Sequence, residues 1–218
     1  MQFQTLPNDI IIELCKYMNV TDISSLYYTH SYLQTIINNN SKYIYSVCQH
    51  IQPHGFIRKW WGDRHSVKYE ISYLDGKLHG KYTRWYTSGN LLEDCFYIDG
   101  KRNGEYRRWY ANGQLLEECF YIDGKKNGEY RRWCASGQLT CNVFFIYGKR
   151  DGEYKEWYNS GNLYQHCFYI DGKRNGEYRR WYANGQMLEE CVYINGKRYG
   201  DYKRWCASGE LLIRMAIL

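Results

Sequence analysis

Cysteine is the first residue type in this sequence whose spacing could support chemistry. Four cysteines share a period of 24 residues, at Cys95, Cys119, Cys167 and Cys191. Such a column could bind a metal ion or form disulfides. If each period spans two strands, however, neighbouring members lie roughly 9–10 Å apart, whereas a disulfide needs Cα atoms within about 7 Å. We therefore expect small, buried, reduced thiols.

Carboxylates also recur with this period, which argues against catalysis. An active site is normally single, whereas the acidic column has five members: Glu105, Glu129, Glu153, Glu177 and Asp201. The six histidines are scattered and follow no metal-ligand spacing. Loops such as residues 76–80 are too short to hold a phosphate, and no helix follows them. The sequence predicts neither an enzyme nor a cofactor or metal site.

Basic residues form the most regular charged pattern. Five dibasic pairs recur every 24 residues, at Lys101-Arg102, Lys125-Lys126, Lys149-Arg150, Lys173-Arg174 and Lys197-Arg198. A basic edge of this kind could bind an anionic lipid surface or nucleic acid. It could equally be a solvated edge that prevents aggregation, and neighbouring aspartates, Asp99, Asp123 and Asp171, dilute its positive charge. Both interpretations remain open.

Composition excludes several classes of protein. The 218 residues carry a net charge of +6, and all of the excess lies after residue 75. The sequence has no apolar run of about 18 residues that would predict a transmembrane helix. Residues 1–7 lack the basic and apolar regions of a secretory signal. Nine cysteines in such a chain indicate reduced thiols, so we expect a reducing compartment, the cytoplasm.

These columns belong to six repeats of 24 residues. Glycine and tryptophan recur without slippage, and residues 96–114 return identically as 168–186. In the second repeat, Asp99-Gly100 predicts a tight turn, residues 105–110 a strand, residues 111–114 a second turn and residues 115–122 a return strand. The expected fold is mainly β: a repetitive antiparallel array of six β-hairpin units, each packed on its neighbours, with a small N-terminal α-helical domain.

Charge pairing suggests a register for each hairpin. If Tyr110 faces Leu115 across the turn, Arg108 faces Glu117 and Arg107 faces Glu118, and opposite charges across a strand pair are favourable. Under this register both faces mix charged with apolar residues. A clean in/out alternation is therefore not expected.

The units resemble MORN repeats, in the variant form Gly-x-Tyr-x-x-Trp-Tyr-x-x-Gly-x-Leu. Residues 104–115 and their five copies carry this pattern, and the six repeats that contain it make up about two thirds of the chain. Cys134 and Cys206 replace the second aromatic residue, and Met187 replaces the leucine. The Gly-x-Gly spacing of standard MORN units is absent. The resemblance implies a binding array, and similar variants resemble those labelled bacterial antitoxins, which would make it a protein-neutralising module.

Residues 5–40 predict three short helices, and the stretch from Leu6 to about Ile37 resembles an F-box. The resemblance implies docking to a Skp-type adaptor protein of a cullin-RING ubiquitin ligase, through Leu6, Pro7, Ile10, Ile11, Leu14, Met18, Ile23 and Leu26. Tyr32 or Leu33 stands where the family tends to carry a tryptophan. The alternative is a helical cap on the repeats. F-box and MORN-like units together resemble proteins of large DNA viruses, which would place the chain in a host cytoplasm.

Three regions follow from this pattern. Residues 1–40 are the F-box-like domain, residues 41–75 a linker helix with a degenerate capping hairpin, and residues 76–218 the six MORN-like repeats. The apolar residues 211–218 suggest an edge strand that pairs with another chain or a second copy. The predicted function is a non-enzymatic protein-interaction adaptor for an unknown target protein. The alternative is a scaffold that holds an anionic membrane or polyanion at the basic edge.

We expect the target protein to be recognised by variable positions, because the repeated columns are structural. The two most irregular units supply the candidates, which are Thr140, Asn142, Tyr147, Asn159, Tyr164, Gln165 and His166.

Overall fold

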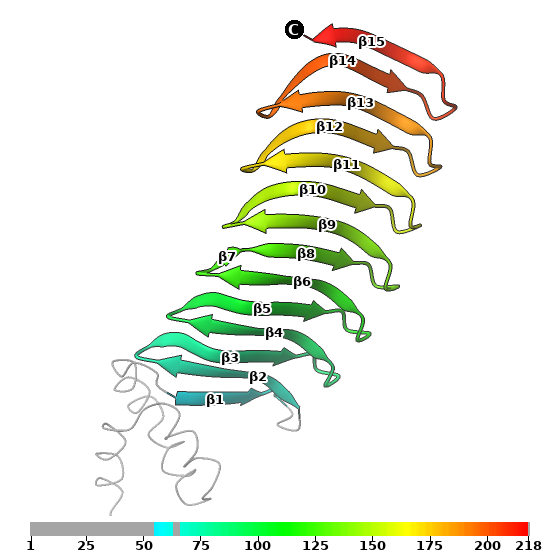
Figure 1. The fold of residues 1–218 in the computed structure, drawn as a ribbon. Helices are drawn as coiled ribbons and strands as arrows, with labels where there is room; N and C mark the ends of the chain where they lie inside the picture. Colours follow the sequence, from blue (N-terminus) through cyan, green and yellow to red (C-terminus); the bar gives the residue numbers. More distant parts are fainter. Residues whose placement is uncertain (1–54, 63–65, 218) are drawn as a thin grey trace, which may run out of the picture.

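The fold is one long antiparallel sheet. The computed structural model describes residues 55–62 and 66–217. Its strands follow one another in space as in sequence, without a crossover (Figure 1). The predicted helices of residues 1–40, with all eight F-box-like positions, and the linker before residue 55 lie outside the described residues.

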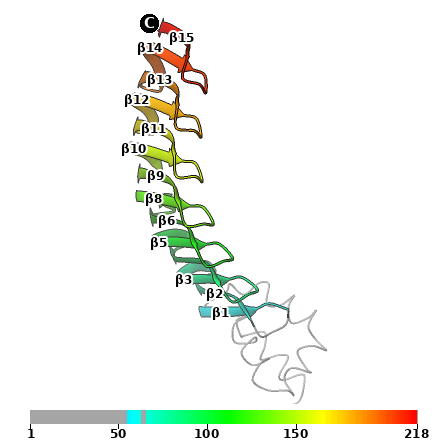
Figure 2. The ribbon, with the colours of Figure 1, turned by 90° about the vertical axis from the view of Figure 1, so that its right-hand side faces the viewer.

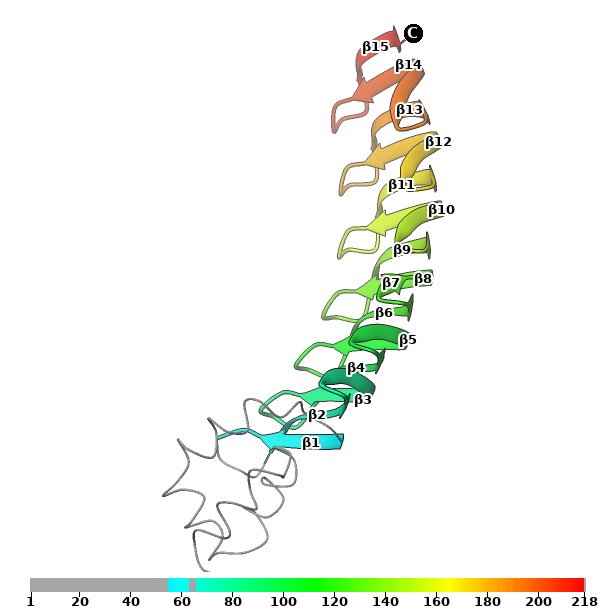
Figure 3. The same ribbon diagram turned by 90° about the vertical axis from the view of Figure 1, so that its left-hand side faces the viewer.

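The sheet contains 15 strands. They are β1 (Gly55–Trp60), β2 (Val67–Leu74), β3 (Lys77–Trp85), β4 (Leu91–Ile98), β5 (Lys101–Trp109), β6 (Leu115–Ile122), β7 (Lys125–Lys126), β8 (Gly128–Trp133), β9 (Leu139–Ile146), β10 (Lys149–Trp157), β11 (Leu163–Ile170), β12 (Lys173–Trp181), β13 (Met187–Ile194), β14 (Lys197–Trp205) and β15 (Leu211–Ile217). Seen edge-on, the described strands form a narrow, gently bent column, with the wider turns offset to one side (Figures 2 and 3). No second layer of described residues covers either face.

The tight turns that link successive units have the conformation that the sequence predicts. Asp99 and Gly100 both have positive φ, 49° and 81°. A two-residue turn with two positive φ values matches the right-handed twist of the flanking strands. Asp or Asn occupies the first position in every such turn except that of Tyr147, whose φ is 46°. A bulky residue in this left-handed region is an outlier.

We expect Tyr147→Asn to raise the free energy of unfolding by about 1 kcal/mol, because asparagine tolerates the left-handed conformation better than tyrosine. The Tyr147 side chain is 63% exposed and so loses little packing. Urea denaturation of the full chain measures the change. Tyr199→Asn is the control, since Tyr199 is also exposed but lies within β14. An unchanged or lower stability of Tyr147→Asn would contradict the prediction.

The wider turns correct part of the predicted register. Arg107 lies opposite Glu118 and Arg108 opposite Glu117, as predicted, but Leu115 lies opposite Trp109 rather than Tyr110. The Tyr110 amide donates to the carbonyl of Gln114 at 2.8 Å. The loop therefore contains three residues and ends in a left-handed glycine, a common hairpin form. Closing this shorter loop introduces a bulge between Arg108 and Trp109.

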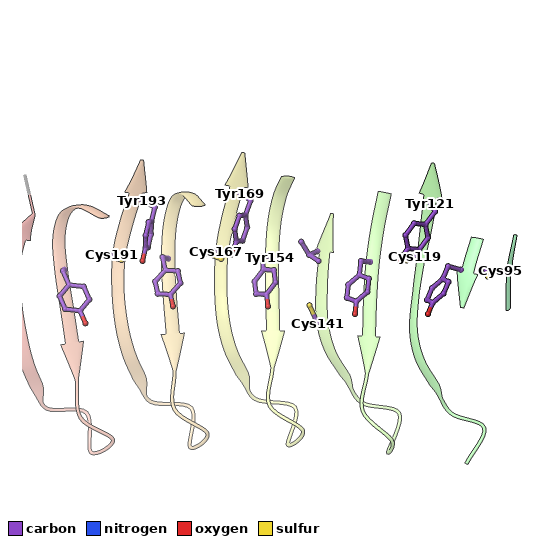
Figure 4. Close-up of a cluster of buried hydrophobic side chains, with 14 residues drawn as sticks. Cys95, Cys119, Tyr121, Cys141, Tyr154, Cys167, Tyr169, Cys191 and Tyr193 are labelled. Atoms are coloured by element: carbon purple, nitrogen blue, oxygen red, sulfur yellow. The ribbon is translucent and has the colours of Figure 1, made fainter. Parts of the chain in front are cut away.

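Burial distinguishes the two faces of the sheet. Tyr106, Cys119 and Tyr121 are buried on one face, which we call the tyrosine face. Their equivalents in other units continue the cluster along the array (Figure 4). Tyrosine rings meet edge to face, as Tyr106 and Tyr121 do with ring centroids 5.5 Å apart, a favourable arrangement. The opposite face, the phenylalanine face, leaves Phe120 exposed.

The cysteine column confirms the prediction of buried free thiols. Cys95, Cys119, Cys167 and Cys191 are all buried and none forms a disulfide. They lie among the tyrosines of the tyrosine face (Figure 4). Burial raises the pKa of the Cys95 thiol to about 12 and that of Cys119 to about 11. These thiols are therefore neutral packing groups at physiological pH.

Candidate functional site

The basic edge is divided between the two faces. Lys101 pairs with Ile98 in the ladder and Arg102 with Tyr97, and consecutive strand residues point to opposite sides. The Arg102 guanidinium stacks 4.6 Å from the Tyr106 ring centroid and forms an ion pair with Glu93 at 2.8 Å. Lys126, Arg150, Arg174 and Arg198 stack on tyrosines in the same way. The second member of each predicted pair thus packs against the tyrosine face.

The lysines that begin each pair remain exposed, but acidic residues of the next turn face some of them. Lys101 Nζ lies 3.2 Å from Asp123, and Lys149 Nζ lies 2.6 Å from Asp171. Lys125, Lys173 and Lys197 are exposed as well. The structure therefore separates the predicted pairs into a lysine column with aspartates beside it and a second set of basic residues on the tyrosine face, of which Arg150 and Arg198 remain exposed.

An apolar stripe runs along the phenylalanine face. Phe96, Phe120 and Phe144 are 42%, 42% and 46% exposed. Two residues further along each strand lies an aliphatic side chain on the same face. The apolar stripe consists of Leu74, Phe96, Ile98, Phe120, Ile122, Phe144, Ile146, Phe168, Ile170, Val192 and Ile194. Its length and repetition distinguish it from isolated exposed apolar residues.

Charged residues beside the apolar stripe largely neutralise one another. Glu105 lies opposite Phe120 and forms an ion pair with Arg107 at 3.2 Å. The recurring acidic column repeats this arrangement with Arg131, Lys155 and Arg179. In the fourth unit Glu153 also contacts His166 at 2.9 Å, and hydrogen bonds from Lys155 and His166 lower the pKa of this carboxyl. The repeated carboxylates are therefore structural partners of basic residues.

A second set of contacts joins the wider turns of successive units. The Tyr110 hydroxyl donates to the carbonyl of Trp133 at 3.0 Å, and Asn112 Nδ2 donates to the carbonyl of Ala135 at 2.9 Å. The tyrosine bond recurs from Tyr86, Tyr158 and Tyr182 to the tryptophan of the following unit. We call these residues the tyrosine ladder.

The tyrosine ladder is interrupted in the third unit. Cys134 and Ser136 replace the tyrosine and asparagine, and Cys134 Sγ lies 3.0 Å from Ser136 Oγ. An open hollow of about 710 Å³ occupies this junction. It is lined by Tyr110, Leu116, Arg132, Trp133, Cys134, Ala135, Thr140, Glu156, Trp157, Tyr158, Asn159 and Tyr164.

The variable positions proposed as target-reading residues lie in several places. Thr140, Asn159 and Tyr164 line the hollow at Cys134, and Asn142 lines a smaller depression of about 230 Å³ beside Phe144. Other positions belong to the framework: Tyr147 forms a turn, and buried Gln165 accepts a hydrogen bond from Tyr178. The replacement of an aromatic residue by Cys134 is visible in the sequence, whereas the hollow beside it was not predicted.

In the part of the chain that the structure describes, no group of three or more His, Cys, Asp and Glu side chains could hold a metal ion. Within residues 55–62 and 66–217 the chain forms no helix long and apolar enough to cross a membrane.

The fold and these surfaces define a single-layered β-hairpin repeat protein. Residues 78–99, 102–123, 150–171 and 174–195 match the family of the MORN repeat variant, which confirms the MORN prediction for four of the six predicted repeats. Each matched stretch carries a tyrosine of the tyrosine ladder. MORN repeats are as a rule non-catalytic and mediate contacts with proteins or membranes. No curated protein matches the chain.

Proposed function

We propose that the protein is a non-enzymatic interaction adaptor whose array binds a target protein through the apolar stripe. The exposure of the stripe is the observation that carries this proposal. Phe96, Phe120 and Phe144 repeat along the phenylalanine face with aliphatic neighbours in the same strands. Exposed apolar residues that recur along one face, rather than scattered singly, are typical of protein contacts. Aromatic anchors are also enriched among the residues that dominate binding energy.

The charges favour a protein over an anionic membrane as the partner. Binding to anionic lipid depends on clustered, unneutralised basic residues. Here Arg102 and its equivalents stack on tyrosines, Lys101 and Lys149 contact aspartates, and glutamates accompany the phenylalanines. The lysine column still carries exposed positive charge, so membrane binding is the alternative that the experiment must test.

The proposal extends to the N-terminal region, where docking to a Skp-type adaptor would link a bound target to ubiquitin transfer. Its support is the sequence resemblance of residues 6–37 to an F-box. In this arrangement the helices and the array bind different partners. Substitutions in one region should therefore leave the other contact intact.

The double variant Phe120→Arg/Phe144→Arg tests the array. We expect proteins that co-purify with the tagged full chain from an extract of the source cells to fall by more than about tenfold, since loss of an anchor costs about 2 kcal/mol or more. Quantitative mass spectrometry measures the change. Gln138→Arg, at an exposed turn position, is the control and should keep the partners. An equal loss of co-purified proteins in both variants would contradict binding through the apolar stripe.

Two further binding measurements test the adaptor contact and the membrane alternative. Purified Skp-type adaptor should bind the full chain and the stripe variant but not Leu14→Asp. Absence of adaptor binding to a folded full chain would limit the proposal to the array. Vesicles containing phosphatidylserine should not retain the protein. Salt-sensitive retention that Lys101→Glu/Lys173→Glu abolishes would favour the membrane scaffold instead.

A further inference from the structure

The hollow at Cys134 lies where the regular structure places a tyrosine side chain. Tyr86, Tyr110, Tyr158 and Tyr182 occupy this position in the first, second, fourth and fifth units, and each reaches the tryptophan carbonyl of the next unit. In the third unit the side chain is the much smaller Cys134, bonded to Ser136 instead. Among the described residues, the Trp157 carbonyl accepts no tyrosine hydroxyl of this kind.

The walls of the hollow are suited to an aromatic ring. Trp133 ends β8 and Trp157 ends β10, the equivalent strands of the third and fourth units, and Tyr110 and Tyr158 are the tyrosine-ladder residues on either side of the interruption. Tyr158 also meets Tyr164 edge to face, with centroids 5.0 Å apart, so the wall is held in place. Aromatic rings in such surroundings gain offset or edge-to-face contacts beyond simple burial.

The polar groups of the hollow disfavour a strongly charged ligand. Glu156 accepts the Tyr154 hydroxyl at 2.8 Å and lies 3.5 Å from Arg132. The carboxylate and guanidinium therefore offset each other. Thr140 Oγ1 is also engaged, since it donates to the Arg132 carbonyl at 3.0 Å. The Trp157 carbonyl differs from its equivalents in four other units, each of which accepts a phenol hydroxyl.

We propose that this hollow binds a tyrosine side chain of the target protein. The ring occupies the place that Cys134 leaves empty, and its hydroxyl donates to the Trp157 carbonyl. The inference rests on the proposed function, since it names a residue type by which the target is recognised. It assigns recognition to the junction between the third and fourth units, where the variable residues Asn159 and Tyr164 also line the hollow.

Disulfide tethering at Cys134 tests the site without any target. The full chain is equilibrated with a 4-hydroxyphenethyl disulfide and a thiol buffer, and peptide mass spectrometry measures labelling. Cys206 is a matched control in the same molecule, because its Sγ lies 2.9 Å from Ser208 Oγ and the described chain has no unit beyond it. Hydrogen bonds from the neighbouring serines lower the pKa of both thiols. Their intrinsic reactivities are thus comparable.

We expect the hydroxyphenethyl group to label Cys134 about three- to tenfold more than the phenethyl group does, the range that one net hydrogen bond supplies. At Cys206 the two probes should label equally. Equal labelling of Cys134 and Cys206 by the hydroxyphenethyl probe would overturn the site. Equal labelling of Cys134 by both probes would overturn the assignment of tyrosine.

Cys134→Tyr provides a second, independent readout. This variant restores the tyrosine ladder and fills the hollow, so co-purified target should fall by about tenfold, whereas Cys206→Tyr should retain it. Selective tethering together with an unchanged target in Cys134→Tyr would show that the target does not use the hollow, and would overturn the proposal. If no target is captured by any variant, the proposed function fails, while tethering still decides whether the hollow accepts a phenol.

Discussion

Truncation of Tyr178 to alanine should lower the free energy of unfolding by about 3–5 kcal/mol, the range for large aromatic residues removed from a packed interior. Its side chain is 3% exposed. The ring meets Tyr193 with centroids 5.3 Å apart, and Arg174 stacks on it at 4.8 Å. With no second layer among the described residues, these neighbours provide much of the burial available to each unit, and little nearby can move into the cavity.

Urea denaturation followed by circular dichroism measures this loss. Tyr178→Phe isolates the hydroxyl, which bonds Gln165 at 3.3 Å and Glu189 at 3.4 Å, and should cost about 1 kcal/mol. Tyr199→Ala should cost less than about 0.5 kcal/mol, because Tyr199 is exposed. A loss for Tyr178→Ala no larger than that for Tyr178→Phe would contradict the role of the ring.

The second large effect is expected in alkali, where the array should lose stability between about pH 9 and pH 12. Burial raises the pKa of Cys119 from 9.0 to about 11 and that of Tyr121 from 10.0 to about 12. At a pH above the pKa values of these groups in the unfolded chain, the unfolded chain releases protons that the folded chain retains. The free energy of unfolding therefore falls as the pH rises. The loss of stability levels off once the pH passes the folded pKa values, because the group is then ionised in both states. Below pH 9 these groups should have no effect.

Urea midpoints measured across this pH range test the alkaline loss. Cys119→Val removes one titrating thiol and should reduce the slope above pH 9. The substitution is mild because Val143 occupies the same column in the third unit and is buried there. A slope that is the same in the variant and the parent chain would show that the Cys119 thiol does not contribute. A pH-independent midpoint would contradict the prediction as a whole.

The fold could be predicted from the sequence because each local signal agrees with the repeat. The Asp99-Gly100 turns and the Arg107–Glu118 and Arg108–Glu117 pairs all have their expected places. The bulge at Trp109 was not predicted. A four-residue and a three-residue loop are both compatible with the residues around Asn112, and only the hydrogen bond from Tyr110 to Gln114 distinguishes them.

The candidate surfaces were predicted less completely. The sequence predicts Lys101 and Arg102 as one charged pair, but strand alternation places them on opposite faces, and Arg102 stacks on aromatic rings. The two faces differ in burial more clearly than in residue type. The buried face also holds charged residues, since Glu93 and Arg102 form an ion pair among its tyrosines. The hollow could not be predicted from the sequence, because it depends on a contact between two units. Cys134 is too short to bond the carbonyl of Trp157 in the next unit.

The interrupted tyrosine ladder also has a mechanical consequence. Hairpins that contact only their neighbours are links in series, so tension along the array loads every junction equally. Most of the ladder junctions between wider turns carry a tyrosine bond and an asparagine bond, as Tyr110 and Asn112 do. The junction after Cys134 has neither of these bonds, and it is held by the strand pairing between β9 and β10 together with the Arg132–Glu156 ion pair at 3.5 Å. When force is applied to the two ends of the array, we therefore expect the first three units to separate from the last three at this junction before any other junction opens.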